Sequence, residues 1–264
     1  MTTYQLSTSE LPRNNYKLCD VPASRPVSWL KEGWSDFRAR PGLGLVYGSL
    51  AALVGLLLSY GMYSLGMLYM VPVLSAGFLL IAPVLVAGLY ADARQRQKPG
   101  KTQAKKTGRR LYLNMTSISG MGIILLLVFL NWIMLSNLLL AGVVDQALPT
   151  LEGSAGSLSL LYDNMAFLLV YIGLGAFLAA LVFRMCVTSI PMLVDQDIDT
   201  FNALFLSWKA SGENPATMIV WAFMIAALTL AGILTAFLGL ILVVPVLGYA
   251  SWHAYRDLVQ PARL

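Results

Sequence analysis

Long apolar runs, separated by short polar segments, dominate this chain. Each run is long enough for a helix to cross about 30 Å of hydrocarbon, which takes roughly 18 residues or more. The pattern predicts an all-α, polytopic membrane protein whose helices form hairpins: first with second, third with fourth, and fifth with sixth. The six predicted transmembrane helices are about 43–63, 68–91, 115–141, 165–188, 216–236 and 238–256.

Two shorter segments, before the first and the fifth transmembrane helix, carry apolar residues on a single helical face. The first has Val27, Leu30 and Trp34, and the second has Phe201, Leu204 and Trp208 at the same offsets. We predict that both are amphipathic helices in the cytoplasmic membrane interface, with Trp34 and Trp208 as anchors at the headgroups. A proline follows each tryptophan by seven residues, as Pro41 and as Pro215. Each proline is predicted to begin a transmembrane helix, where its missing N–H costs little.

The similarity of these two segments continues into the second and sixth transmembrane helices. In each, a proline is followed by an aromatic residue after seven positions and by an arginine after eleven. The matched residues are Pro83, Tyr90 and Arg94 in one helix, and Pro245, Trp252 and Arg256 in the other. This predicts a parallel internal repeat, with units about 27–96 and 199–258, and adds Tyr90 and Trp252 to the interfacial anchors. The middle hairpin, about 112–195, lacks the Trp-to-Pro spacing, so it is left open whether this hairpin is a third copy of the repeat.

Charge sets the predicted orientation of the helices. The segment between the second and third carries eight basic residues, which favour the cytoplasmic side: Arg94, Arg96, Lys98, Lys101, Lys105, Lys106, Arg109 and Arg110. The segment 143–164 has no Lys or Arg and is predicted to lie outside, so both termini are predicted to be cytoplasmic. Contact with lipid headgroups is favoured over nucleic acid for the basic segment, because no aromatic residues are interleaved for base stacking.

Composition agrees with a membrane setting. Hydrophobic residues make up 58% of the 264-residue chain and charged residues only 12%, against about 25% charged in soluble domains. Residues 1–26 are polar and are predicted to be a disordered cytoplasmic tail. Residues 27–260 are predicted to be a single six-helix membrane domain.

Candidate chemistry is sparse. The chain has one histidine, His253, and two cysteines, Cys19 and Cys186, which are too few for the usual zinc or haem ligand sets. No P-loop and no nucleophile elbow occurs. We therefore expect no catalytic residues, no metal site and no cofactor, and we predict that the protein is not an enzyme.

Four polar residues near or within the spans remain as candidates, because ionisable groups inside membranes often serve function. One interpretation gives Arg184, Asp195 and Asp197 a functional role. The alternative is that Arg184 only reaches the membrane interface and that the aspartates cap helices. Asn131 lies in mid-span, and packing between helices is favoured over a polar path. Asp199 is a predicted N-cap for the amphipathic helix that contains Trp208.

Three segments suggest a family. They read SWLKEGWSDFRARPGLGLVYG, SIPMLVDQDIDTFNALFLSWKASGENP and FLGLILVVPVLGYASWHAYRDL. Together they resemble the bacterial integral membrane proteins of domain-of-unknown-function family 2189, over about residues 27–260. The resemblance implies a multi-pass protein of the bacterial inner membrane, without an assigned activity or assigned functional residues.

Three functions follow from these features. The first is a non-enzymatic accessory, assembly or scaffold factor, with membrane lipids and subunits of a larger membrane complex as partners and no nucleic acid. The alternative is a small permease or channel for an apolar or weakly polar solute, because prolines in or near the spans could break helices and free backbone carbonyls. The third is a membrane enzyme that uses Arg184 and the aspartates on a lipid headgroup.

Overall fold

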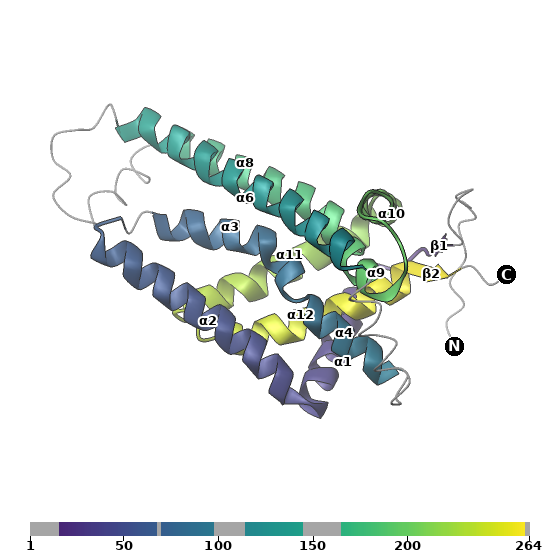
Figure 1. Ribbon diagram of the computed structural model, residues 1–264. Helices are drawn as coiled ribbons and strands as arrows, with labels where there is room; N and C mark the ends of the chain where they lie inside the picture. The colour runs from purple at the N-terminus through teal and green to yellow at the C-terminus, as the bar shows by residue number, and fades with distance from the viewer. Residues whose placement is uncertain (1–15, 68–69, 98–113, 145–164, 262–264) are drawn as a thin grey trace. The chain divides into compact units, whose positions relative to one another are not determined.

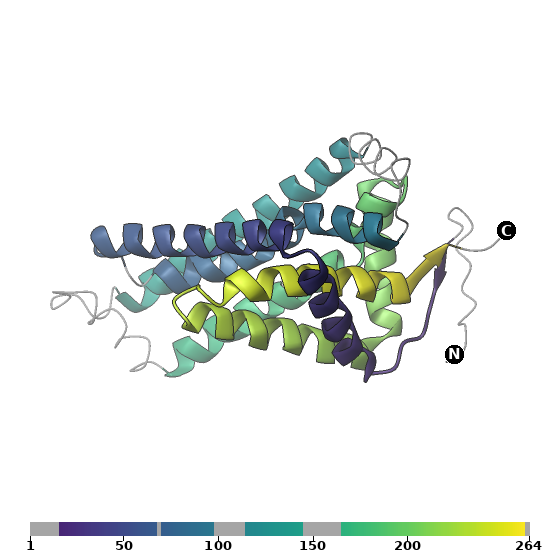
Figure 2. The same ribbon diagram turned by 90° about the horizontal axis from the view of Figure 1, so that it is seen from below.

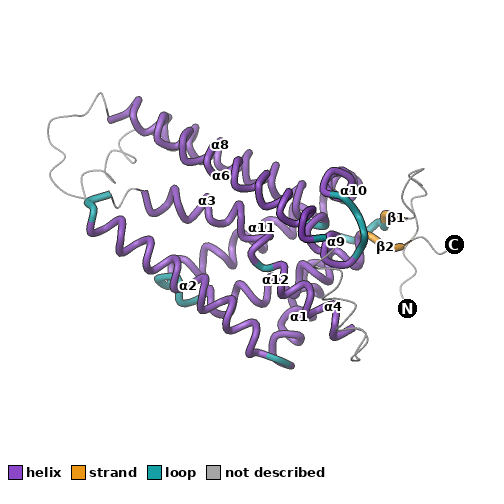
Figure 3. The backbone as a smooth tube through the Cα atoms, in the orientation of Figure 1, coloured by secondary structure: helices purple, strands orange, loops and turns teal. Residues whose placement is uncertain are grey.

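The computed structural model describes residues 16–67, 70–97, 114–144 and 165–261, and most of these residues are helical (Figure 3). The helices are α1 Arg25–Ala39, α2 Pro41–Ser64, α3 Met70–Leu85, α4 Ala87–Gln97, α6 Met115–Val144, α8 Met165–Cys186, α9 Ser189–Asp195, α10 Thr200–Glu213, α11 Pro215–Leu234 and α12 Leu240–Leu258 (Figure 1). The strands are β1 Tyr16–Leu18 and β2 Val259–Pro261. The all-α prediction is confirmed.

Five helical segments among the described residues are long and apolar enough to cross a membrane: Pro41–Ser64, Met70–Gln97, Met115–Ala141, Met165–Asp195 and Pro215–Leu234. Each corresponds to one of the first five predicted spans. The sixth predicted span, about 238–256, corresponds to α12, which is helical but is not among the five. The reason is the polar second half of α12, which carries His253, Arg256 and Asp257.

Contacts divide the chain into two compact units. The first comprises the described residues within Met1–Ala52, Pro83–Met121 and Phe183–Leu264. The second comprises those within Leu53–Ala82 and Gly122–Val182.

In the first unit, α1 lies directly against α12, as Figure 2 shows for the dark purple and yellow helices. A side chain cannot be placed between them, since a Cβ added at Gly33 would lie 2.7 Å from the backbone nitrogen of Ala250. Trp29 and Phe37, on the same face of α1 as Gly33, are buried. A second glycine, Gly48, brings α2 equally close to α12. A Cβ at Gly48 would clash with the backbone of Ile241 in α12. These close approaches hold α1, α2 and α12 together.

In the second unit, Trp132 of α6 is buried and contacts side chains or backbone of two other helices. Its indole Nε1 donates a hydrogen bond to the carbonyl of Val73 in α3, at 2.9 Å. Its ring also lies 5.4 Å from that of Tyr171 in α8, at an interplanar angle of 49°. Gly175 of α8 faces the Trp132 ring, where an added Cβ would come within 3.1 Å. One aromatic residue thus contacts two neighbouring helices.

The segment before α1 corrects one prediction. Residues 16–26 were expected within a disordered tail, but β1 pairs antiparallel with β2, and α1 already begins at Arg25. The side-chain amide of Asn214 holds the segment after β1. It accepts a hydrogen bond from the Val21 N–H at 2.8 Å and donates one to the Cys19 carbonyl at 3.1 Å. The prediction failed because these partners lie at the other end of the chain. Residues 1–15 lie outside the described residues.

The start of α10 follows the sequence prediction. Asp199 is the N-cap, and its carboxylate accepts a hydrogen bond from the backbone N–H of Asn202 at 3.2 Å. Slight burial opposes ionisation of this carboxyl, but hydrogen bonds from the side chain and backbone of Asn202 outweigh it and lower its pKa. The ionised carboxylate therefore stabilises the folded helix.

Replacing Asp199 with Ala is expected to lower the free energy of unfolding by about 1 kcal/mol, the usual value of an N-cap. Because the folded-state pKa lies below the unfolded value of about 3.9, the contribution is complete above that value and is lost as pH falls through the folded pKa. Chemical unfolding in detergent at pH 7 and at decreasing pH measures this. A difference between wild type and variant that grows towards acid pH contradicts the capping role.

Candidate functional site

A buried ion pair connects three helices of the first unit. Arg94 of α4 donates from Nε to Oδ1 of Asp195, the last residue of α9, at 2.6 Å. Both residues are less than one-tenth exposed. The other carboxylate oxygen, Oδ2, accepts from the Tyr255 hydroxyl of α12 at 2.9 Å and lies 3.4 Å from Arg256 Nη1. Asp195 is therefore the common acceptor for side chains of α4 and α12.

The energetic role of this pair follows from its burial. Removing two charges from water costs several kcal/mol for each ion, and their attraction offsets this only when further hydrogen bonds satisfy the remaining atoms. Asp195 meets that condition, since Gln196 Nε2 also donates to Oδ2, at 2.8 Å. Removal of one partner would leave a buried charge unpaired.

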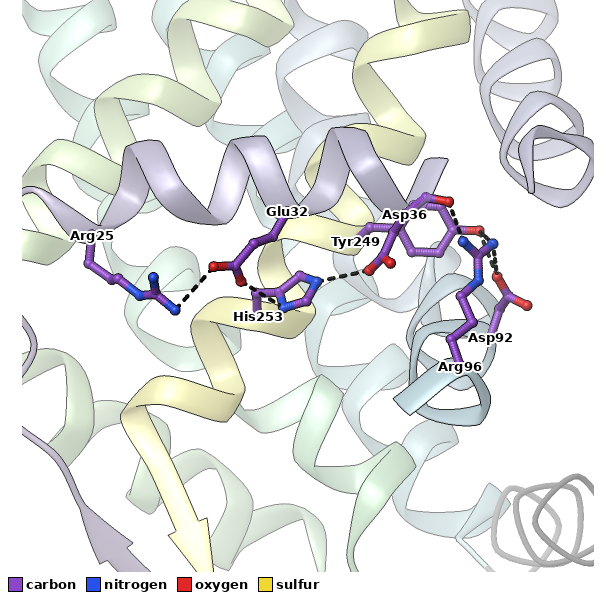
Figure 4. Close-up of polar contacts among 7 residues, drawn as sticks. All are labelled: Arg25, Glu32, Asp36, Asp92, Arg96, Tyr249 and His253. Carbon is purple, nitrogen blue, oxygen red and sulfur yellow. Dashed lines mark hydrogen bonds and ion pairs between the residues drawn. The ribbon is translucent and has the colours of Figure 1, made fainter. Parts of the chain in front are cut away.

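The histidine occupies a second polar cluster, between α1 and α12, shown in Figure 4. Nδ1 of His253 lies 3.0 Å from Oε2 of Glu32, and Nε2 lies 2.8 Å from Oδ2 of Asp36. A carboxylate can only accept a hydrogen bond, so both contacts are hydrogen bonds when both ring nitrogens carry protons. One imidazole thereby connects two successive turns of α1 to α12.

The cluster extends from both ends of this imidazole. At one end, Arg96 of α4 donates to the backbone carbonyl of Asp36 and pairs with Asp92, while the Tyr249 hydroxyl donates to Asp92 at 2.8 Å (Figure 4). The guanidinium of Arg96 also lies over the Tyr249 ring, 4.7 Å from its centroid. Arg96 thus contacts the backbone of α1, a carboxylate of its own helix and the ring of Tyr249 in α12.

At the other end, Arg25 at the start of α1 bridges two carboxylates. Its Nη2 lies 3.1 Å from Glu32, and its Nε donates to Asp257 of α12 at 2.6 Å. The same Asp257 oxygen accepts from the indole of Trp29, at 2.7 Å. Both halves of α1 are therefore attached to α12 by charged groups.

The geometry of this cluster does not suit a metal ion. The two ring nitrogens of His253 face opposite directions, one towards Glu32 and one towards Asp36, so the three side chains cannot converge on one point. Across the ranges that the structure describes, no group of three or more His, Cys, Asp or Glu side chains could hold a metal. Both cysteines, Cys19 and Cys186, are buried and free.

The four polar candidates from the sequence do not form one site. Arg184 contacts Ser211 and Trp208 of α10, and Asp195 lies in the buried ion pair. Asp197 is exposed. Asn131 is exposed on α6, and among the described residues no bond from it to another helix is present. No ion pair between Arg184 and either aspartate is present in the described part of the chain, and α8, which carries Arg184, ends at Cys186.

The predicted interfacial anchors divide into two groups. Trp34 and Trp208 are each 42% exposed, on helices where the sequence placed them. Tyr90 and Trp252 are 4% and 1% exposed, so they lie inside the protein and cannot reach a headgroup. Their assignment as anchors is wrong, because the spacing of an aromatic residue along a helix does not distinguish a lipid neighbour from a protein neighbour.

The prediction that Pro41 and Pro215 begin helices is confirmed. Pro41 is the first residue of α2, and Pro215 is the first residue of α11. Their fixed φ suits the first turn of a helix, and the missing N–H has no partner there in any case.

The sequence placed Arg94 in the basic segment and Arg94 and Arg256 in the repeat, but it predicted neither their contact with Asp195 nor the carboxylates that contact His253. A signal for the arginines existed, since Arg94 and Arg256 each follow a proline by eleven residues. No signal existed for His253 and Asp36, which are 217 positions apart in the chain.

The Arg94–Asp195 pair lies in the part of the chain that matches a known protein family. Residues 70–195 match the model of DUF2189, a family described as "Predicted integral membrane protein". This supports the resemblance found in the sequence, over a narrower range than the expected 27–260. The DUF2189 segment includes α4 and α9 but neither α1 nor α12. The Arg94–Asp195 pair therefore lies within it, whereas His253 and its partners Glu32 and Asp36 lie outside. No curated protein and no solved structure matches the chain.

Proposed function

We propose that this integral membrane protein is a non-enzymatic accessory, assembly or scaffold factor for a membrane complex. The observation that carries the proposal is the internal pairing of its polar side chains. Asp195 accepts from groups on α4 and α12, and His253 is held between two carboxylates of α1. Such pairing fixes helices relative to one another, which suits a static support for partner subunits.

The proposed setting is the bacterial inner membrane, with six spans and both termini cytoplasmic. The Lys and Arg residues between the second and third predicted spans support this orientation. The pairing of β1 with β2 supports it as well, because it brings residues 16–18 and 259–261 together on one side. In this arrangement α12 is the sixth span, with its polar half at the cytoplasmic end.

We also infer that the chain contains a parallel internal repeat, in which the segments about 27–96 and 199–258 are two copies of one unit. In both repeat units a helix of similar length precedes a helix that begins with proline. These first helices are α1 and α10. The buried positions correspond too: Trp29, Gly33 and Phe37 of α1 match Ala203, Ser207 and Ser211 of α10 at a constant offset. The opposite faces, with Trp34 and Trp208, are exposed and suit the cytoplasmic interface, with lipid as the partner.

Gentle solubilisation from native membranes, followed by mass spectrometry of the purified material, tests the scaffold proposal. We expect other membrane subunits at a fixed stoichiometry that persists after a second purification step. A tagged, unrelated multi-pass protein expressed at the same level is the control for non-specific recovery. Purification of this chain alone would contradict the proposal.

One observation favours a permease or channel as the second candidate. The segment Met70–Gln97 is interrupted between α3 and α4, close to Pro83, and interrupted helices can expose backbone groups to a solute. The purified chain in liposomes should then produce solute flux on its own. Flux without any partner would favour this candidate over the scaffold.

A further inference from the structure

Arg184 differs from the arginines of the buried clusters because no acidic partner for it is found within the described ranges. It lies near the end of α8, half-buried, and among the described residues no carboxylate oxygen is within ion-pair distance of its guanidinium. By contrast, Arg25, Arg94, Arg96 and Arg256 each face an aspartate. An unneutralised guanidinium at the end of an apolar helix is an attractive site for an anion.

Neutral contacts hold this guanidinium in one orientation. Its carbon lies 3.9 Å from the centroid of the Trp208 ring, so the flat group stacks on the indole. Nε donates to the Ser211 hydroxyl at 3.3 Å, and Nη2 donates to the Trp208 carbonyl at 3.4 Å. Arginine has five N–H donors, so further N–H groups stay available for a ligand. Stacking orders the group without neutralising its charge.

The surface beside Arg184 is apolar and exposed. On α10, Phe201 is 77% exposed and Phe205 is 55% exposed, and both lie on the same side of the helix as Trp208. Gly212 keeps the approach to the guanidinium open, since a Cβ there would come within 3.1 Å of Nη2. A ligand that suits this surface combines an anionic group with hydrocarbon.

We propose that Arg184, stacked on Trp208, binds the phosphate of an anionic phospholipid, whose acyl chains cover Phe201 and Phe205. The proposal rests on the interfacial position proposed above for α10. Guanidinium and phosphate form paired, charge-assisted hydrogen bonds, and Trp with Arg is typical of the headgroup level of a bilayer. The adjacent phenylalanines favour a lipid over a soluble phosphate, because only the lipid removes their surface from water.

Native mass spectrometry of the full chain, titrated in detergent with phosphatidylglycerol or phosphatidylcholine, tests the site. We expect selective retention of phosphatidylglycerol by the wild type and about a tenfold loss of its affinity in Arg184→Gln, as for a charged hydrogen bond. Arg184→Lys should recover part of the affinity, because it keeps the charge but not the planar fork. Gly212→Val, which keeps the arginine, should weaken binding by obstructing the guanidinium.

Arg38→Gln is the matched control, since Arg38 is an exposed arginine at the end of α1, the other amphipathic helix. An equal loss in Arg38→Gln, or unchanged binding in Arg184→Gln, would overturn the proposal. Competition by inorganic phosphate as strong as that by phosphatidylglycerol would also overturn it, in favour of a soluble anion. Partner recovery from the same membranes reports on the scaffold role separately, so the two proposals can fail independently.

Discussion

Replacing Asp195 with Ala is expected to lower the free energy of unfolding by about 3–5 kcal/mol, the range for removing one member of a buried ion pair. The physical reason is the charge left behind, because Arg94 is 8% exposed and pairs with Asp195 at 2.6 Å. Tyr255 and Arg256 lose the same acceptor. Unfolding of the purified variant by a graded denaturing detergent, followed by circular dichroism, measures the loss.

Asp197→Ala is the matched control for this variant. Asp197 is two residues away and exposed, so its replacement should change stability by no more than about 0.5 kcal/mol. Asp195→Asn keeps the shape and removes the charge, and it should fall between the two. Equal stability of Asp195→Ala and Asp197→Ala would show that the ion pair does not hold α4, α9 and α12 together.

Replacing Gly48 with Ala is expected to destabilise the protein by about 1–3 kcal/mol, as overpacking of a filled interior does. A Cβ at this position would overlap the backbone of Ile241 in α12, and backbone cannot move aside as a flexible side chain can. Gly33→Ala should act similarly, since its Cβ would meet the backbone of Val246 and Ala250. Thermal unfolding in detergent is the measurement.

Gly61→Ala supplies a control of opposite sign. Gly61 also lies in α2, but an added Cβ has no neighbour within 4 Å, so only the better helix propensity of alanine remains. That propensity should raise stability by up to about 1 kcal/mol. If Gly48→Ala were stabilising to the same degree, the close approach of α2 and α12 would be refuted.

Features that depend on neighbouring residues in the chain could be predicted well. Asp199 caps α10, and Pro41 begins α2, because caps and first turns involve only a few consecutive residues. Apolar runs likewise identified five segments able to cross a membrane, since length and hydropathy are properties of the segment itself.

Errors arose where a residue's neighbour was distant in the chain. Trp252 has the spacing of an interfacial anchor but is buried, because other helices of its unit cover it where lipid was expected. Residues 16–18 have the polar pattern of a tail, but they pair with residues 259–261. In both cases the local pattern was correctly identified, but its environment was not.

The sequence by itself determined that this is a helical membrane protein, where α2, α10 and α11 begin, and that its chemistry-bearing residues are few. Only the tertiary structure decided which charges meet. Arg94, Asp195 and Arg256 come from three different helices, and His253 reaches carboxylates on a helix near the other end of the chain. The reason is physical: hydropathy and capping act over one or two helical turns, whereas an ion pair depends on how helices lie against each other. Glycines such as Gly33 allow that close approach, and a glycine in a sequence does not reveal which helix it faces.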